Sequence, residues 1–160
     1  MKKIKVFLSD VDGVLTDAGM YYTESGDEFK KFHTHDGMGF QLLREAGIKT
    51  GIVTSEITKI VERRAAKLKV DYLFQGKGFG VKLEIAKEIC LKEGIQLDSL
   101  AYIGDDVNCI ELLKAAGVCA CPRNATQKVK AIEGIKQLRL AGGEGVVREF
   151  IEWLFEQDYC

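Results

Sequence analysis

The sequence predicts an α/β fold, a doubly wound parallel sheet with a β-hairpin inserted after the first strand. Two observations support this prediction. Short apolar runs alternate along the chain with segments of helical periodicity, which is typical of a parallel sheet covered by helices on both faces. The length of 160 residues, 46% of them apolar, suits one such layered domain over 1–160, and we expect no cap domain over a cleft.

The N-terminal half contains the first strand, the hairpin and two further strands with their helices. The first strand is expected over 4–8. Ser25 and Gly26 are typical turn residues between two short strands, at 20–23 and 28–32. The elements that follow are a helix at 39–46 ended by Gly47, a strand at 49–54, a helix at 57–68 and a strand at 70–74.

The C-terminal half continues the alternation, so that five or six strands are expected in all. Gly117 closes one of its helices, and the last strand is the weakest of the set. Its expected elements are a helix at 81–93, a strand at 100–103, a helix at 107–116, a strand at 118–121, a short helix at 125–132, a strand at 137–140 and a helix at 146–155.

Charge, hydropathy and cysteine content limit the possible partners. Lys and Arg number 23 against 24 Asp and Glu, without a basic stripe, which argues against nucleic acid and favours a small molecule. No apolar run approaches the ~20 residues that span a bilayer, and Asp10 and Asp12 interrupt any export signal. Five cysteines, an odd number, are typical of reduced thiols, so we expect a cytoplasmic protein without membrane contact.

The first strand ends in two carboxylates, Asp10 and Asp12. Side chains at i and i+2 of a strand emerge on the same side. Two carboxylates this close repel each other unless a cation lies between them. A hard divalent cation, Mg²⁺ by preference, suits such oxygen ligands.

Other polar side chains follow the later strands at positions that would meet the same edge of the sheet. Thr54 and Ser55 follow one strand, and Lys82 begins a helix. Asp105 and Asp106 follow another strand. Because ligands of such folds bind beyond the carboxyl ends of the strands, these side chains would gather in one place. The pattern predicts a site that binds Mg²⁺ and a phosphate group together.

Four motifs in this order resemble the haloacid dehalogenase superfamily of phosphohydrolases, and the match spans almost the whole chain. This resemblance implies a Rossmann-like fold of the haloacid dehalogenase type. The motifs are DxDGV at 10–14, Thr-Ser at 54–55, Gln-Gly leading to Lys-Leu at 75–83, and GDD at 104–106.

Three longer segments narrow the resemblance to the small capless members of the superfamily, which dephosphorylate 3-deoxy-2-keto sugar acid phosphates. The members in question are the KDO 8-phosphate phosphatases and the related KDN 9-phosphate phosphatases of sialic-acid type. The segments are 10–17, 71–76 and the Gly-rich stretch at 142–149.

The resemblance implies a role for each matching residue. Asp10 would be the nucleophile that forms an aspartyl phosphate, and Asp12 the general acid and base. Asp105, with Asp10 and the backbone carbonyl of Asp12, would hold Mg²⁺. The residues implied in binding phosphate or substrate are Thr34, Thr54, Ser55, Glu56, Arg64, Lys67, Lys82 and Asn108.

Glu56 and Lys67 bear on the choice between the two branches. KDO 8-phosphate phosphatases usually carry Gly-Arg at 55–56, so Glu56 with Lys67 favours KDN 9-phosphate, with KDO 8-phosphate as the alternative substrate. Arg64 lies one turn before Lys67, and two cations on one helix face suit a sugar carboxylate. An ordinary solvated helix face is the other interpretation of these charges.

Two features depart from the family pattern. Cys109 stands where the family commonly has a further Asp, so either Asp106 supplies the second acidic group or metal binding is weakened. The loop before Lys82 is longer than usual, which makes Lys77 a rival for its role. Lys82 keeps the expected helical register and is the residue we choose.

Other classes of function fit parts of the pattern. The aspartates also suit a phospho-accepting signalling module, but no Asp follows the strand at 70–74, where such a module accepts phosphate. Cys109 keeps open a catalytically idle homologue used for assembly. His33 and His35 are candidate metal ligands, although histidines of a loop at the cleft edge are the more ordinary interpretation.

The small size also predicts self-association. An uncapped cleft on a monomer would bind a small sugar poorly, and the resemblance implies a homotetramer. We expect neighbouring subunits to close the cleft, with the hairpins at the core of the assembly. Arg64, Lys67 or the Gly-rich segment at 142–149 would reach across to the neighbour.

Overall fold

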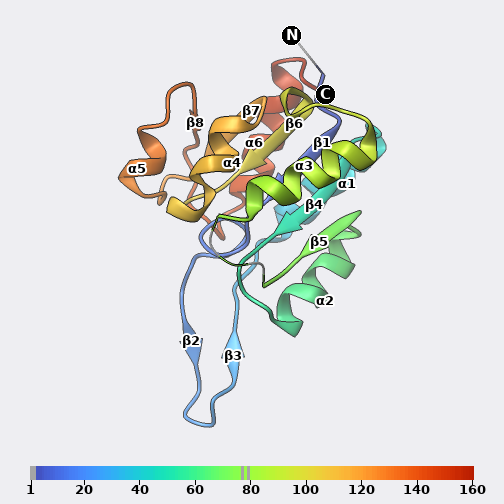
Figure 1. Cartoon of the computed structure of the whole chain (residues 1–160). Helices are drawn as coiled ribbons and strands as arrows, with labels where there is room; N and C mark the ends of the chain where they lie inside the picture. Colours follow the sequence, from blue (N-terminus) through green and yellow to red (C-terminus); the bar gives the residue numbers. More distant parts are fainter. Residues whose placement is uncertain (1–2, 77, 79) are drawn as a thin grey trace.

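A six-stranded parallel sheet forms the centre of the molecule, in a computed structural model that describes residues 3–76, 78 and 80–160. The strand order is β5-β4-β1-β6-β7-β8, and a separate antiparallel pair, β2-β3, projects from the body as a hairpin (Figure 1). The strands are β1 (Val6–Ser9), β2 (Tyr21–Tyr22), β3 (Glu28–Phe29), β4 (Lys49–Val53), β5 (Tyr72–Phe74), β6 (Leu100–Ile103), β7 (Val118–Cys121) and β8 (Lys136–Gln137). The expected fold class is confirmed.

Helices lie on both faces of this sheet (Figure 1). Short 3-10 turns at Leu97–Ser99 and Val107–Cys109 precede β6 and α4. The helices are α1 (Thr34–Glu45), α2 (Lys59–Leu68), α3 (Lys82–Glu93), α4 (Ile110–Ala115), α5 (Gln127–Lys130) and α6 (Val146–Glu156).

The alternation of side chains along β1 divides the core into two layers. Phe7 points to the face covered by α1, α2 and α6, where its ring meets those of Phe40 and Phe150 at centroid distances of 5.9 and 5.8 Å. Val6 and Leu8 point to the opposite face, covered by α3, α4 and α5. Because β1 lies between β4 and β6, its carboxyl end emerges in the middle of the sheet edge.

The element bounds differ from expectation mainly at α1 and in the hairpin. The helix expected at 39–46 begins at Thr34, because the Nδ1 atom of His33 accepts a hydrogen bond from the backbone N–H of His35 and caps the helix. The two histidines therefore begin a helix instead of lying in a loop. The hairpin strands are only two residues long each, and their side chains are largely exposed. Among the described residues, no helix is long and apolar enough to cross a membrane.

Asp36 fastens α1 to α6. Its side chain is buried, and Oδ1 accepts a hydrogen bond of 2.9 Å from the backbone N–H of Arg148, in the first turn of α6. The N-cap residue of α6, Gly145, has no side chain that could do this. Burial raises the pKa of Asp36 to about 6, against the opposing effect of the backbone N–H groups and of the Arg64 charge.

Replacement Asp36→Asn should change how stability depends on pH. The folded-state pKa of about 6 lies above the ordinary 3.8, so the contribution of Asp36 to stability is lost as pH rises through this interval. Asn does not titrate and keeps an acceptor for the Arg148 N–H. Relative to the wild type, the variant should therefore gain about 2–3 kcal/mol in the free energy of unfolding between about pH 4 and about pH 8. Urea unfolding at both pH values measures this, and parallel profiles would contradict it.

Candidate active site

A cavity of about 290 Å³ opens at the carboxyl ends of β1, β4 and β6. This is the edge at which the hairpin leaves the body (Figure 1). Seven of the residues expected in the site line the cavity, namely Asp10, Asp12, Thr54, Ser55, Glu56, Asp105 and Asn108. The parallel sheet therefore gathers residues from three separate strand ends.

The turn after β1 places Asp10 and Asp12. Asp10 extends the strand, since its backbone N–H donates to the carbonyl of Ile103 at 3.1 Å. Its Oδ1 accepts from the backbone N–H of Val11 at 2.8 Å, which fixes the carboxylate plane. Gly13 then adopts a φ of 79°, and a Cβ at this position would lie 1.9 Å from the Asp105 carboxylate. Only glycine satisfies both conditions.

Lys82 and Cys109 contact the second oxygen of Asp10. The Nζ atom of Lys82 donates to Oδ2 at 2.5 Å, and both side chains are buried. The Cys109 thiol donates to the same oxygen at 2.9 Å and accepts from the Tyr102 hydroxyl at 3.2 Å. Burial alone would lower the pKa of Lys82, but the charge of Asp10 outweighs this effect and raises it. The choice of Lys82 over Lys77 is thus consistent with the contacts of Lys82, while Lys77 lies outside the described residues.

The donor atoms around Asp105 suit Mg²⁺. One ligand atom each from Asp10, Asp105 and Cys109 lies within 4.8 Å of the others. Burial, followed by the charges of Asp10 and Asp106, raises the pKa of Asp105 to about 7, and a divalent cation would offset that repulsion. Burial raises the pKa of the Cys109 thiol to about 12, so it stays neutral and is a poor ligand for a hard cation. Asp10 and Asp105 are the side chains that would hold the metal.

Asp106 does not replace the carboxylate that is missing at position 109. It is exposed, and its Oδ1 accepts from the backbone N–H of Val107 at 2.7 Å, capping the 3-10 turn before α4. Asn108 donates from Nδ2 to the Ser55 hydroxyl at 3.4 Å and so connects two walls of the cavity. Thr54, buried at the end of β4, accepts from the backbone N–H of Glu56 at 3.4 Å.

Four of the expected substrate contacts do not line this cavity within the single chain; one of them, Lys82, contacts Asp10 directly, and the other three lie further away. Thr34 is exposed at the start of α1, and Lys67 is exposed on α2. Arg64 is half-buried; its Nη2 donates to the backbone carbonyl of His33 at 2.8 Å, and its guanidinium lies 5.2 Å from the centre of the Phe32 ring. Arg64 therefore joins α2 to the segment before α1, a contact that sequence pattern does not reveal.

Asn124 is a site residue that the sequence analysis missed. Its Nδ2 donates to the carbonyl of Gly13 at 3.1 Å, while its Oδ1 accepts from the backbone N–H of Gly142 at 2.7 Å. A Cβ on Gly142 would lie 2.2 Å from that same Gly13 carbonyl. The start of the Gly-rich segment at 142–149 thus packs on the Asp12 turn of its own chain.

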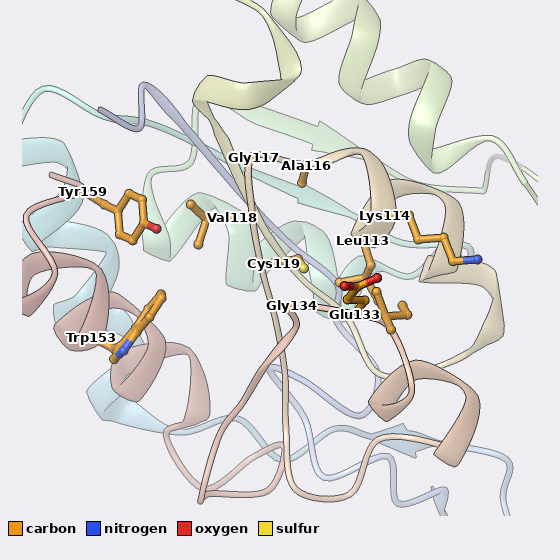
Figure 2. A pocket seen from close by; sticks show the side chains of 11 residues that line it. Leu113, Lys114, Ala116, Gly117, Val118, Cys119, Glu133, Gly134, Trp153 and Tyr159 are labelled. Carbon is orange, nitrogen blue, oxygen red and sulfur yellow. The ribbon is translucent and has the colours of Figure 1, made fainter. Parts of the chain in front are cut away.

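A larger cavity, of about 470 Å³, lies at another part of the sheet, beside Val118 and Cys119 at the start of β7 (Figure 2). Trp153 and Tyr159 lie together on one side of it, with ring centroids 5.7 Å apart, and Lys114 and Glu133 lie on the other. A single carboxylate, Glu133, lines it. Because it lacks a cluster of carboxylates and hydroxyls, the smaller cavity is the one equipped for phosphate chemistry.

Known proteins similar to this chain match it over almost its whole length. A family model described as haloacid dehalogenase-like hydrolase matches residues 80–134. The 3-deoxy-D-manno-octulosonate 8-phosphate phosphatase of Haemophilus influenzae is 32% identical over 158 residues, covering 98% of this chain and 85% of the relative. A crystal structure of the phosphatase of that name from Moraxella catarrhalis, in complex with magnesium ion, phosphate ion and KDO, is 34% identical. Its TM-score is 0.90, with coverage of 98% of this chain and 89% of that one.

A third similar structure, from Legionella pneumophila, is described as a putative hydrolase of subfamily III A. It is 33% identical with a TM-score of 0.90, and the match covers 98% of this chain and 85% of that one. The chain belongs to the haloacid dehalogenase superfamily, and within it to the capless phosphatases. It is a phosphoric monoester hydrolase, and its acidic cluster suits Mg²⁺, the ion present in the Moraxella catarrhalis structure.

Mg²⁺ should stabilise the folded protein through Asp105. At about 100 times its Kd, a bound ion adds about 2.7 kcal/mol of stability, which is roughly 5–10 °C in Tm for a chain of this size. The variant Asp105→Asn should lose this shift. The matched variant Asp106→Asn should retain most of it, because Asp106 lies outside the cluster of ligand atoms. Thermal unfolding with Mg²⁺ and with EDTA measures the shift, and an equal loss in the two variants would contradict the assignment.

Proposed function

We propose that the protein hydrolyses the phosphate monoester of a 3-deoxy-2-keto sugar acid through an aspartyl-phosphate intermediate on Asp10. The observation that carries the proposal is the buried contact of Asp10 with Lys82, beside Asp105 and at the base of a cavity that Asp12 also lines. A carboxylate that contacts a lysine and adjoins a cation site is suited to attack a phosphate group. The lysine and the cation would neutralise the negative charge of the phosphate oxygens from two sides.

The reaction has two steps. A carboxylate oxygen of Asp10 attacks phosphorus, the bond from phosphorus to the sugar oxygen breaks, and Asp12 gives its proton to the departing alkoxide. Asp12 then takes a proton from a water molecule that attacks the phosphorus, which releases inorganic phosphate and restores Asp10. Thr54 and Lys82 hold the phosphoryl oxygens throughout. Asp10 and Asp105 would hold Mg²⁺, which would supply positive charge beside the transferring phosphoryl group.

KDO 8-phosphate is the substrate we favour. Two of the three similar proteins named above are KDO 8-phosphate phosphatases, and one of these is described in complex with KDO. Of the two residues taken to indicate KDN 9-phosphate, Lys67 does not line the cavity of its own chain, and neither does Arg64, its neighbour on α2. Glu56 does line it, and this is the observation that keeps KDN 9-phosphate as a second candidate. The expected preference for KDN 9-phosphate is therefore reversed.

Purified enzyme with Mg²⁺ should release phosphate from KDO 8-phosphate with a higher kcat/KM than from KDN 9-phosphate or N-acetylneuraminate 9-phosphate. Phosphate release at several concentrations of each substrate measures this order. An Asp10→Asn variant, which lacks the nucleophile, should lose at least about 10³-fold in kcat. A preference for KDN 9-phosphate would contradict the proposed substrate and support Glu56 as the residue that indicates it. Full activity of Asp10→Asn would refute the mechanism.

We also propose that the enzyme is a cytoplasmic homotetramer in which hairpins of neighbouring copies cover the cleft. Met20, Tyr22 and Phe29 on the hairpin are 59%, 61% and 57% exposed, a concentration of apolar surface on an element of two-residue strands. A lone hairpin of this length is marginal in water, so burial against another copy would stabilise it. The cysteines are free thiols, in keeping with a reducing compartment.

Light scattering should therefore report four copies for the wild type. The double variant Tyr22→Ser/Phe29→Ser should shift the mass towards smaller species, because it removes apolar area from the hairpin. Leu91→Ser is a matched control, since Leu91 is 83% exposed on α3, away from the hairpin. A monomeric wild type at working concentration, or equal dissociation of the control, would contradict this arrangement.

A further inference from the structure

Lys30 lies at the point where the hairpin meets the active-site cavity. It follows β3 directly, and its side chain is only 3% exposed. Its Nζ atom lies 2.7 Å from Oδ1 of Asp12, 2.9 Å from Oε2 of Glu56 and 3.6 Å from Oε1 of Glu28. The next residue, Lys31, is 57% exposed, with its ammonium 3.9 Å from Asp17. Two adjacent lysines thus have opposite environments.

The three carboxylates explain why Lys30 is buried as a cation. An ammonium taken out of water must find partners for its N–H donors, and here Asp12 and Glu56 accept hydrogen bonds while the Glu28 carboxylate lies 3.6 Å away. Burial alone would lower the pKa of Lys30, but the hydrogen bonds to Asp12 and Glu56 outweigh burial and raise it. Lys30 therefore stays positively charged although its side chain is buried, and its contacts hold it in one position.

The contact with Lys30 fixes the orientation of the Asp12 carboxylate. Oδ1 of Asp12 accepts from Lys30 at 2.7 Å and from the Thr16 hydroxyl at 3.4 Å. Among the described residues, none donates a hydrogen bond to Oδ2. Because Oδ1 already accepts two hydrogen bonds, Oδ2 is the oxygen that is free to exchange a proton with a group in the cavity that Asp12 lines.

We propose that Lys30 is a positioning residue for proton transfer by Asp12, a role that rests on the proposed function. It holds Oδ1 so that Oδ2 is aimed at the leaving oxygen of the substrate. Through Lys30, the hairpin would then support catalysis in its own chain, in addition to its proposed contact with neighbouring copies. Glu56, which shares the same ammonium, connects this arrangement to the wall of the cavity.

Two aryl phosphates of nearly the same shape separate this role from substrate binding. Phenyl phosphate releases a basic phenolate that needs a proton as it leaves, whereas p-nitrophenyl phosphate releases an anion that needs none. Neither contains a sugar, so a lost contact between Lys30 and a sugar would not distinguish them. The value of kcat/KM reports the steps up to departure of the leaving group, and it is independent of the later hydrolysis of the aspartyl phosphate.

In a Lys30→Met variant, kcat/KM on phenyl phosphate should fall about 100-fold, while kcat/KM on p-nitrophenyl phosphate should change by less than about threefold. Lys30→Arg, which keeps the charge and the donors, should recover part of the loss. Lys31→Met is the matched control and should behave as wild type on both substrates. Lys30→Gln provides a neutral donor for the same comparison if the Met variant does not fold.

Equal losses on the two aryl phosphates, or no loss on either, would overturn the role of Lys30. A wild-type enzyme that hydrolyses both aryl phosphates but no sugar acid phosphate would refute the proposed substrate and leave this test intact. A wild-type enzyme that hydrolyses none of them would refute the proposed function itself, together with the role that rests on it.

Discussion

The contact between the Lys82 ammonium and the Asp10 carboxylate is the interaction around which the sheet edge is arranged. Both side chains are buried, and removing two charges from water costs more than their attraction returns unless other polar groups join them. Here the backbone N–H of Val11 and the thiol of Cys109 complete the shell of Asp10. The pair forms because the fold brings the carboxyl end of β1 and the start of α3, the helix that follows β5, to the same edge of the sheet.

A second constraint is the tight packing of the turn after β1. Gly13 is in contact with Asp105, and its carbonyl accepts a hydrogen bond from Asn124. Gly142 and Gly143 press on the same turn from the far end of the chain, and the backbone N–H of Gly143 donates to the carbonyl of Val14 at 3.1 Å. The positions of Asp10 and Asp12 thus depend on segments distant in sequence. A rigid turn suits catalysis in a site that has no cap domain, because the carboxylates do not have to be ordered by closure.

Several features of the site could be predicted from sequence because their signals are local. Asp10, Asp12, Asp105 and Thr54 each follow an apolar strand, and the parallel fold determines which edge they share. Their chemical roles stay predictions that follow from the family resemblance and the geometry. We favour KDO 8-phosphate over the KDN 9-phosphate predicted from sequence because residues of α2 need not point towards the cavity: Lys67 does not line it, and Arg64 is engaged by His33 and Phe32 instead.

The features that could not be predicted depend on contacts between distant parts of the chain. Lys30 looks like any lysine of a charged hairpin until the fold brings Asp12 and Glu56 to it. Asn124 looks like a turn residue until Gly13 and Gly142 lie on either side of it. The early start of α1 depends on the side chain of His33, which acts as a cap although histidine is not among the usual capping residues.

The central claim, that Asp10 carries the phosphoryl group, is tested most directly by trapping the intermediate. An Asp12→Asn variant, which cannot activate water, should accumulate the aspartyl phosphate when mixed with p-nitrophenyl phosphate and Mg²⁺. Acid quenching followed by borohydride reduction converts an aspartyl phosphate to homoserine, which peptide mass spectrometry locates. The account predicts homoserine at position 10 in proportion to the burst of p-nitrophenolate. A burst with residue 10 unmodified, or with the modification at another residue, would contradict it.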